Sequence, residues 1–95
     1  MNTFIVSYDI NEGQNVPRSA QEARTALISA IREFGTWAKI TESCWAIASD
    51  MTATQIRDRL LSQIREVDRL MVVQSAHVAA WHNTFCRNDW LMENI

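Results

Sequence analysis

Of all the features of this sequence, two helix-capping boxes constrain the fold most strongly. Ser19 and Glu22 form an S-x-x-E box, and Thr52 and Gln55 form a second box of the same type. Such a box satisfies free backbone N–H groups at the start of a helix. Apolar residues recur at helical spacing behind each box: Ala20, Ala23, Leu27, Ile31 and Phe34, then Ile56, Leu60, Ile64 and Val67. The pattern predicts two amphipathic helices, the first ending at Gly35 and the second continuing to Val67.

The segments around these helices have the character of β-strands. Residues 3–10 alternate between two faces and are rich in aromatic and β-branched side chains, which is typical of a strand. Residues 37–40 and 44–48 predict a hairpin, residues 70–75 a buried strand, and residues 11–17 a loop with Gly and Pro. The order is strand, helix, strand, strand, helix, strand. Because each helix has one apolar stripe, we expect an α+β fold with both helices on one face of an antiparallel sheet, the ferredoxin-like βαββαβ sandwich.

The chain is long enough for one domain and no more. With 95 residues, 47% of them hydrophobic, we expect a single domain over residues 1–95. Residues 76–95 form an apolar C-terminal extension to the predicted core. Apolar surface of this kind is typical of an interface, so the extension is a possible dimer element that packs on a second copy or closes a sheet edge. The alternative is that it folds back on its own domain.

Charge and composition exclude several classes of protein. The formal net charge is −2 and the pI about 5.6, so the basic excess of a dedicated duplex binder is absent. Arginines in residues 54–69 predict an ion-paired helix face, with phosphate binding as the alternative. The chain has two cysteines, no basic leader before Asp9 and no apolar run of about 20 residues. We therefore expect a cytoplasmic protein with no membrane partner.

Asp9 is the first candidate for chemistry. It lies at the carboxyl end of the first predicted strand, beside a loop, where ligands often bind. One or two carboxylates, together with phosphate oxygens and water, suffice to hold Mg²⁺. A two-fold dimer could bring a second Asp9 close. The alternative is that the Asp9 carboxylate bonds to its own backbone and starts the loop.

Other constellations are weaker. His82 and Cys86 lie four residues apart, but two ligands do not make a zinc site. Cys44 lies between apolar residues and is expected to be an unreactive buried thiol. Trp37 and Trp45 could stack on nucleobases, although their spacing in a small domain favours a place in the core.

Several short motifs together resemble one family. The run Val6-Ser7-Tyr8-Asp9-Ile10 closes the first strand, and Phe34-Gly35 ends the first helix. The runs Ser43-Cys44-Trp45-Ala46-Ile47 and Asp68-Arg69-Leu70-Met71-Val72-Val73 follow. These residues resemble the small CRISPR-associated Cas-two proteins, whose first strand ends in "YDI". The likeness covers nearly the whole chain to Ser75 and is strongest to the standalone SinR-like and virulence-associated protein D types.

The resemblance implies a ferredoxin-like fold, a homodimer and a metal-binding aspartate at Asp9. In that family, two such aspartates face each other across the dimer axis and are proposed to hold Mg²⁺ for phosphodiester cleavage. This chain departs from the family in the loop, where residues 11–14 add an acid and no basic residue precedes Arg18. Family members also act as non-catalytic scaffolds.

Two hypotheses follow. In the first, the protein is a Mg²⁺-dependent endonuclease, with RNA favoured over DNA. Asp9 would be catalytic and hold the metal, Arg18 and Arg57 would bind substrate phosphates, and Tyr8 beside Asp9 would also bind substrate. In the second, the protein is a non-catalytic dimeric adaptor that recruits a protein or nucleic acid. The YDI motif favours the first hypothesis, and the acidic pI and missing basic cluster favour the second. The nuclease is the leading hypothesis, as the function expected of the family, and the adaptor is the alternative.

Overall fold

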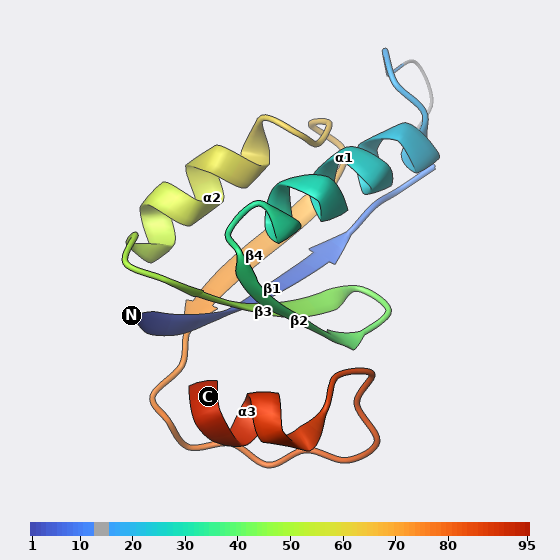
Figure 1. Cartoon of the computed structure of the whole chain (residues 1–95). Helices are drawn as coiled ribbons and strands as arrows, with labels where there is room; N and C mark the ends of the chain where they lie inside the picture. The colour runs from blue at the N-terminus through green and yellow to red at the C-terminus, as the bar shows by residue number, and fades with distance from the viewer. Residues whose placement is uncertain (13–15) are drawn as a thin grey trace.

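A computed structural model describes residues 1–12 and 16–95 of the chain (Figure 1). Residues 13–15, part of the predicted loop, lie outside the described residues. The described elements are β1 (Asn2–Asp9), α1 (Ala20–Arg32), β2 (Thr36–Thr41), β3 (Cys44–Ser49), α2 (Ala53–Leu61), β4 (Arg69–Gln74) and α3 (Asn88–Asn94). The strands and the first two helices occur in the predicted order.

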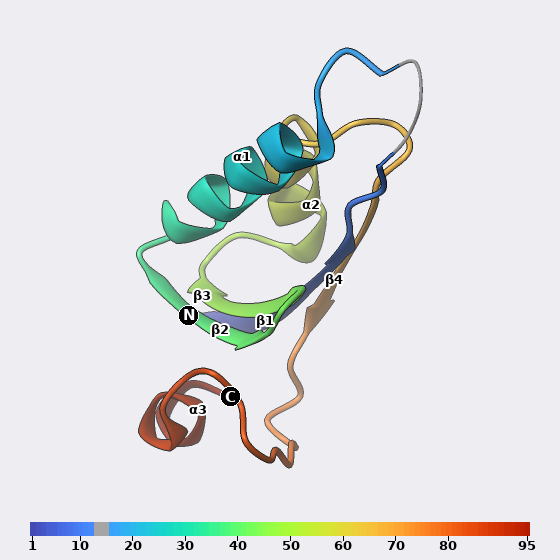
Figure 2. The ribbon, with the colours of Figure 1, turned by 90° about the vertical axis from the view of Figure 1, so that its right-hand side faces the viewer.

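The four strands form one antiparallel sheet in the order β2-β3-β1-β4. Helices α1 and α2 lie side by side on one face of this sheet, and α3 lies on the other face (Figures 1 and 2). The prediction of an α+β fold with two helices on one face of an antiparallel sheet is confirmed. Strand β1 is central and β4 is an edge strand, so the carboxyl end of β1 is next to the start of β4.

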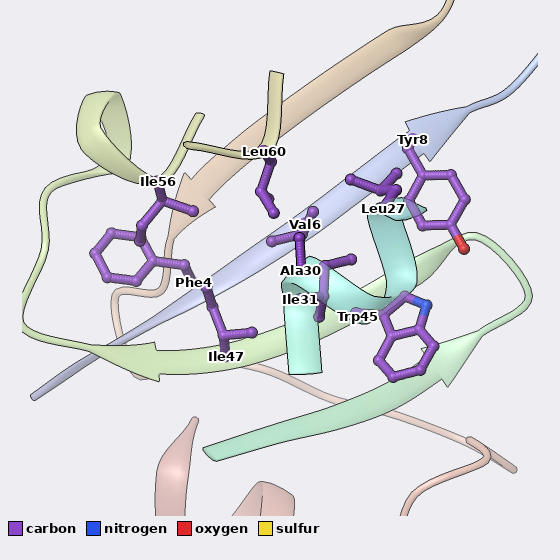
Figure 3. Close-up of a cluster of buried hydrophobic side chains, with 10 residues drawn as sticks. All are labelled: Phe4, Val6, Tyr8, Leu27, Ala30, Ile31, Trp45, Ile47, Ile56 and Leu60. Atoms are coloured by element: carbon purple, nitrogen blue, oxygen red, sulfur yellow. The ribbon is translucent and has the colours of Figure 1, made fainter. Parts of the chain in front are cut away.

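The core lies between the sheet and the two helices. Alternate residues of a strand point to opposite faces, and Phe4, Val6 and Tyr8 of β1 point toward the helices (Figure 3). They are buried with side chains from β3, α1 and α2: Trp45, Ile47, Leu27, Ala30, Ile31, Ile56 and Leu60. The opposite set on β1, which includes Asp9, therefore faces away from the core.

Both predicted capping residues start their helices, but only the second box is formed in both directions. Ser19 Oγ accepts a hydrogen bond from the backbone N–H of Glu22 at 3.1 Å. The side chains and backbones of Thr52 and Gln55 exchange hydrogen bonds of 2.9 and 3.1 Å. After α1, Gly35 adopts a φ of +88°, which costs glycine little because it has no Cβ.

The second helix is shorter than its apolar spacing predicts. It ends at Leu61, so Ile64 and Val67 lie beyond it. The carboxylate of Asp68 accepts a 2.9 Å hydrogen bond from the backbone N–H of Arg65. Such local side-chain bonds compete with helical hydrogen bonds, and here they stabilise a turn in place of further helix.

Residues 76–95 fold back on their own domain, which was the alternative weighed for this segment. The backbone N–H of Phe85 donates to the carbonyl of Ile40 on β2 at 3.1 Å. Leu91 of α3 is only 2% exposed, and Thr3 Oγ1 donates to the carbonyl of Asn94. The small side chains of Ala38, Ala46 and Ala48 leave room for this packing. Within the described residues, no helix has the length and apolar character needed to cross a bilayer.

Candidate functional site

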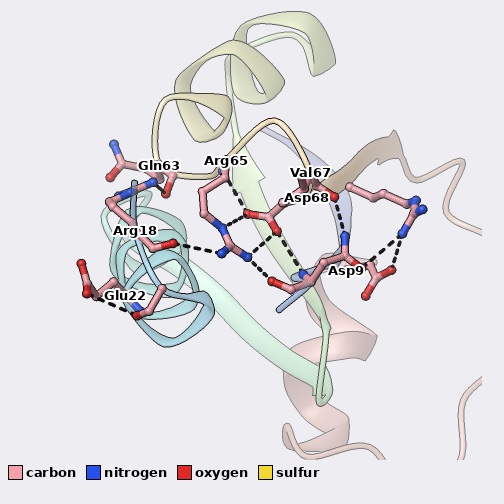
Figure 4. A network of polar contacts seen from close by, with 10 residues as sticks. Asp9, Arg18, Glu22, Gln63, Arg65, Val67 and Asp68 are labelled. Carbon is pink, nitrogen blue, oxygen red and sulfur yellow. Dashed lines mark hydrogen bonds and ion pairs between the residues drawn. The ribbon is translucent and has the colours of Figure 1, made fainter. Parts of the chain in front are cut away.

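The carboxylate of Asp9 forms an ion pair with Arg69 at the end of β1 (Figure 4). Asp9 and Arg69 are register partners in the antiparallel β1–β4 pair, so their side chains share one face. Asp9 Oδ2 lies 2.9 Å from Arg69 Nη1, and the side chains are 60% and 73% exposed. The alternative, an Asp9 carboxylate bonded to its own backbone, is not seen among the described residues, where the carboxylate pairs with Arg69 instead.

Asn11 places a second side-chain oxygen beside this pair. Arg69 Nη1 lies 3.5 Å from Asn11 Oδ1, at the outer limit of a hydrogen bond. The side-chain amide group of Asn11 donates to the carbonyl of Val67. The backbone N–H of Asn11 donates to Asp68 Oδ1 at 3.0 Å. The chain that leaves Asp9 is therefore tied to the segment that enters β4.

A buried ion pair fixes both segments. Arg65 Nη2 lies 2.9 Å from Asp68 Oδ1, and their side chains are only 2% and 0% exposed. The Arg65 guanidinium also donates to the backbone carbonyls of Arg18, at 3.0 Å, and of Asn11. This pair therefore connects the two ends of the β1–α1 loop to the β4 entry (Figure 4).

The environment stabilises the charged forms of both residues. Burial alone raises the pKa of Asp68, but the side chain of Arg65 and the backbone N–H groups of Arg65 and Asn11 outweigh burial. Together they hold the pKa of Asp68 below its usual value. Hydrogen bonding to Asp68 raises the pKa of Arg65 further above the range where it could lose its proton.

The other predicted site residues do not gather around Asp9. Tyr8 is 6% exposed and lies in the core, where its hydroxyl donates to the carbonyl of Glu42 at 3.3 Å. It thus faces the opposite side of the sheet from Asp9. The guanidinium of Arg18 donates to the carbonyl of Gln63. Arg57 lies on α2 in an exposed ion pair with Asp58 at 2.8 Å.

The weaker constellations form no further candidate site in the described part of the chain. Among the residues that the structure describes, no three His, Cys, Asp or Glu side chains are placed to hold a metal ion together. Cys44 is only partly buried, not buried as predicted, but this burial raises the pKa of its thiol, which fits an unreactive cysteine. Trp45 is 1% exposed and belongs to the core. Trp37 is partly buried, its ring 5.5 Å from that of Trp45.

The sequence did not indicate that Arg69 and Asn11 lie beside Asp9. It also did not indicate that Asp68 forms a buried ion pair. The arginines of residues 54–69 were expected on one solvated helix face, but Arg65 and Arg69 lie beyond the end of α2. The β1–β4 register would have paired Asp9 with Arg69. No local pattern supplies that register, because it depends on contacts between distant segments.

No protein-family model matches the chain, and no curated protein matches it in sequence. The candidate site is therefore defined by its geometry and by the motifs described above.

Proposed function

We propose that the protein is a Cas-two-like, ferredoxin-like domain that works as a homodimeric adaptor. Its βαββαβ element order is that of the ferredoxin-like split βαβ fold. The antiparallel order β4-β1-β3-β2, read from the opposite edge of the sheet, supports the same assignment. The adaptor function depends mainly on the sheet face that carries Asp9.

One observation carries the proposal: apolar side chains of the edge strand β4 are exposed on the second sheet face. Met71 and Val73 of β4 are 59% and 46% exposed. Their register partners on β1 are Ser7 and Ile5, and Ile5 is half-buried. Helix α3 lies on the same face below β2 and β3 (Figure 2), and Met71 and Val73 remain exposed. Adjoining exposed apolar side chains on a sheet face favour a protein interface.

A second copy is the occupant that fits this face best. In a two-fold interface the same patch meets itself, so Met71 and Val73 would pack against their equivalents. The Asp9–Arg69 pair lies at the end of the same strands. Its two opposite charges make that end self-complementary, because each copy offers an acid to the base of the other.

The surroundings of Asp9 bear on the metal that the family resemblance implies. A carboxylate and the nearby Asn11 oxygen are ligand types that suit Mg²⁺. However, the Arg69 guanidinium already bonds to the carboxylate and reaches toward the Asn11 oxygen. A bound metal ion would have to displace this guanidinium, so the adaptor is favoured over the nuclease.

Sedimentation velocity tests the dimer. We expect the wild-type protein to sediment at twice the 10.9 kDa chain mass. Met71→Glu should sediment as a monomer, because it places a charge in the proposed interface. Met92→Glu is the matched control, since Met92 is 76% exposed on α3, and it should remain a dimer. A monomeric wild-type protein at every concentration would refute the proposal.

A Mg²⁺-dependent endoribonuclease is the second candidate. The observation that favours a nuclease is the exposure of Asp9, whose side chain is 60% exposed and whose ion pair with Arg69 also lies in solvent. Such surface pairs contribute only about 0–1 kcal/mol, so the carboxylate is accessible to a competing cation. Cleavage of single-stranded RNA that requires Mg²⁺ and disappears in Asp9→Ala would support this candidate. Cleavage that persists in Asp9→Ala would exclude it.

A further inference from the structure

A cavity of about 430 Å³ lies at the edge of β2, on the other side of the molecule from β4. Three aromatic side chains line it: Trp37 from β2, Phe85 from the returning segment and Trp90 from α3. Phe85 is 62% exposed, although its backbone is fixed to β2 by the hydrogen bond to Ile40. The cavity therefore presents aromatic surfaces on a constrained backbone.

The charges of this cavity fall into two groups. Lys39 and Arg87 are basic, while Asp89 and Glu93 are acidic, and all four line the cavity. Lys39 Nζ lies 5.0 Å from the centre of the Phe85 ring. Because the protein's own ammonium group already uses this aromatic face, a cationic ligand is disfavoured there.

The basic groups remain available to an anion. Arg87 pairs with Asp89 at 3.2 Å, with side chains 86% and 59% exposed. Lys39 lies 3.7 Å from Glu42, whose side chain is 83% exposed. Surface pairs of this kind are weak, and guanidinium and ammonium groups are the usual ligands of phosphate. The carboxylates of Asp89 and Glu93 add acceptors that suit an amino group.

We propose that this cavity binds a nucleotide whose base carries an exocyclic amino group. On binding, Lys39 leaves the Phe85 ring for the phosphate, and the base takes its place on that ring beside the neighbouring indoles, as bases stack on aromatic side chains of single-strand binders. The phosphate is held by Arg87 and Lys39. The amino group donates to Asp89 or Glu93, as a cytosine amino group does to acidic side chains. A nucleotide is the ligand class that uses the aromatic, basic and acidic groups together.

The nucleotide has two possible sources, a free mononucleotide or one residue of a single-stranded RNA. The test is titration of the protein with cytidine monophosphate (CMP), uridine monophosphate (UMP), cytidine and a short oligocytidylate, followed by calorimetry. We expect saturable binding of CMP, weaker binding of UMP and weaker binding of cytidine. Tighter binding of the oligomer than of CMP identifies a strand as the source, and equal binding identifies the free nucleotide.

Two variants assign the binding to the cavity. Phe85→Ala should weaken CMP binding about tenfold, through loss of stacking. Arg87→Ala should reduce the preference for CMP over cytidine, because that preference depends on the phosphate and only Lys39 then remains to bind it. Val78→Ala is the control for Phe85→Ala, since Val78 is 90% exposed and outside the cavity lining. Arg24→Ala on α1 is the control for Arg87→Ala. Circular dichroism confirms that each variant is folded.

The cavity proposal is independent of the proposed dimer. Asp9→Ala and Met71→Glu should bind CMP as the wild-type protein does, whatever their oligomeric state. The proposal is overturned if the wild-type protein does not bind CMP saturably, or if folded Phe85→Ala and Arg87→Ala bind CMP with wild-type affinity.

Discussion

The buried carboxylate of Asp68 accepts hydrogen bonds from both the guanidinium and the backbone N–H of Arg65. It also accepts the backbone N–H of Asn11, two residues after Asp9. Asp68 therefore positions the residues that follow β1 as well as those that precede β4. The geometry around Asp9 depends on this interior pair more than on the exposed contact between Asp9 and Arg69.

Asp68→Asn should destabilise the protein strongly. The substitution leaves the Arg65 charge buried without its counter-ion, and removing one member of a buried pair is far more costly than losing an exposed pair. We expect the thermal midpoint to fall on the order of 10 °C. Asp58→Asn, in an exposed pair on α2, is the matched control and should change the midpoint little. A midpoint for Asp68→Asn equal to that of the control would contradict the structural role of the pair.

Acid should remove the contribution of Asp68 to the free energy of unfolding. Its pKa is lower in the folded protein than in the unfolded chain, so its stabilisation is complete above the unfolded value. The contribution is then lost as the pH falls through the lower, folded value. The difference in free energy of unfolding between wild type and Asp68→Asn should therefore shrink as the pH falls below the ordinary pKa range of an aspartate. Urea unfolding across this range measures it, and a constant difference would be inconsistent with the assigned pKa direction.

Removal of the Asp9–Arg69 ion pair should affect stability little. Both side chains are more than half exposed, so Arg69→Ala should cost no more than about 1 kcal/mol. Chemical denaturation gives this value. A cost of several kcal/mol would mean that the pair is a structural element of the fold.

The aromatic ring of Trp45 should be important for stability, whereas its indole nitrogen should contribute little. Trp45→Ala should cost about 3–5 kcal/mol, because the side chain is 1% exposed in the core. Its Nε1 has no hydrogen-bond partner among the described residues, so Trp45→Phe should cost much less. Denaturation of the two variants compares them. Equal losses would show that the indole nitrogen makes a contact that stabilises the protein.

Local signals in the sequence were sufficient for most of the fold. Ser19 and Thr52 start their helices as the capping boxes predicted, and the alternation in residues 3–10 matches the two faces of β1. The end of α2 was not predictable from spacing, because Ile64 continues the apolar stripe beyond the helix. The turn there depends on the carboxylate of Asp68.

The candidate site was predictable only in part. The position of Asp9 at the end of a strand followed from the sequence, but its contact with Arg69 depends on a β1–β4 register between residues 60 positions apart. The assignment of Tyr8 to the core required knowledge of which face the helices cover. Both depend on tertiary contacts, which local sequence propensity does not specify.

The oxidation rates of Met71 and Met92 test the central claim, the dimer face, most directly in the unaltered protein. The two methionines are 59% and 76% exposed in a single chain, so a monomer should oxidise both at similar rates. The proposed dimer buries Met71 and leaves Met92 in solvent. Mass spectrometry after mild peroxide treatment should therefore find Met71 at least about fivefold slower, with the difference lost on dilution. Rates within about twofold of each other at every concentration would contradict the dimer face.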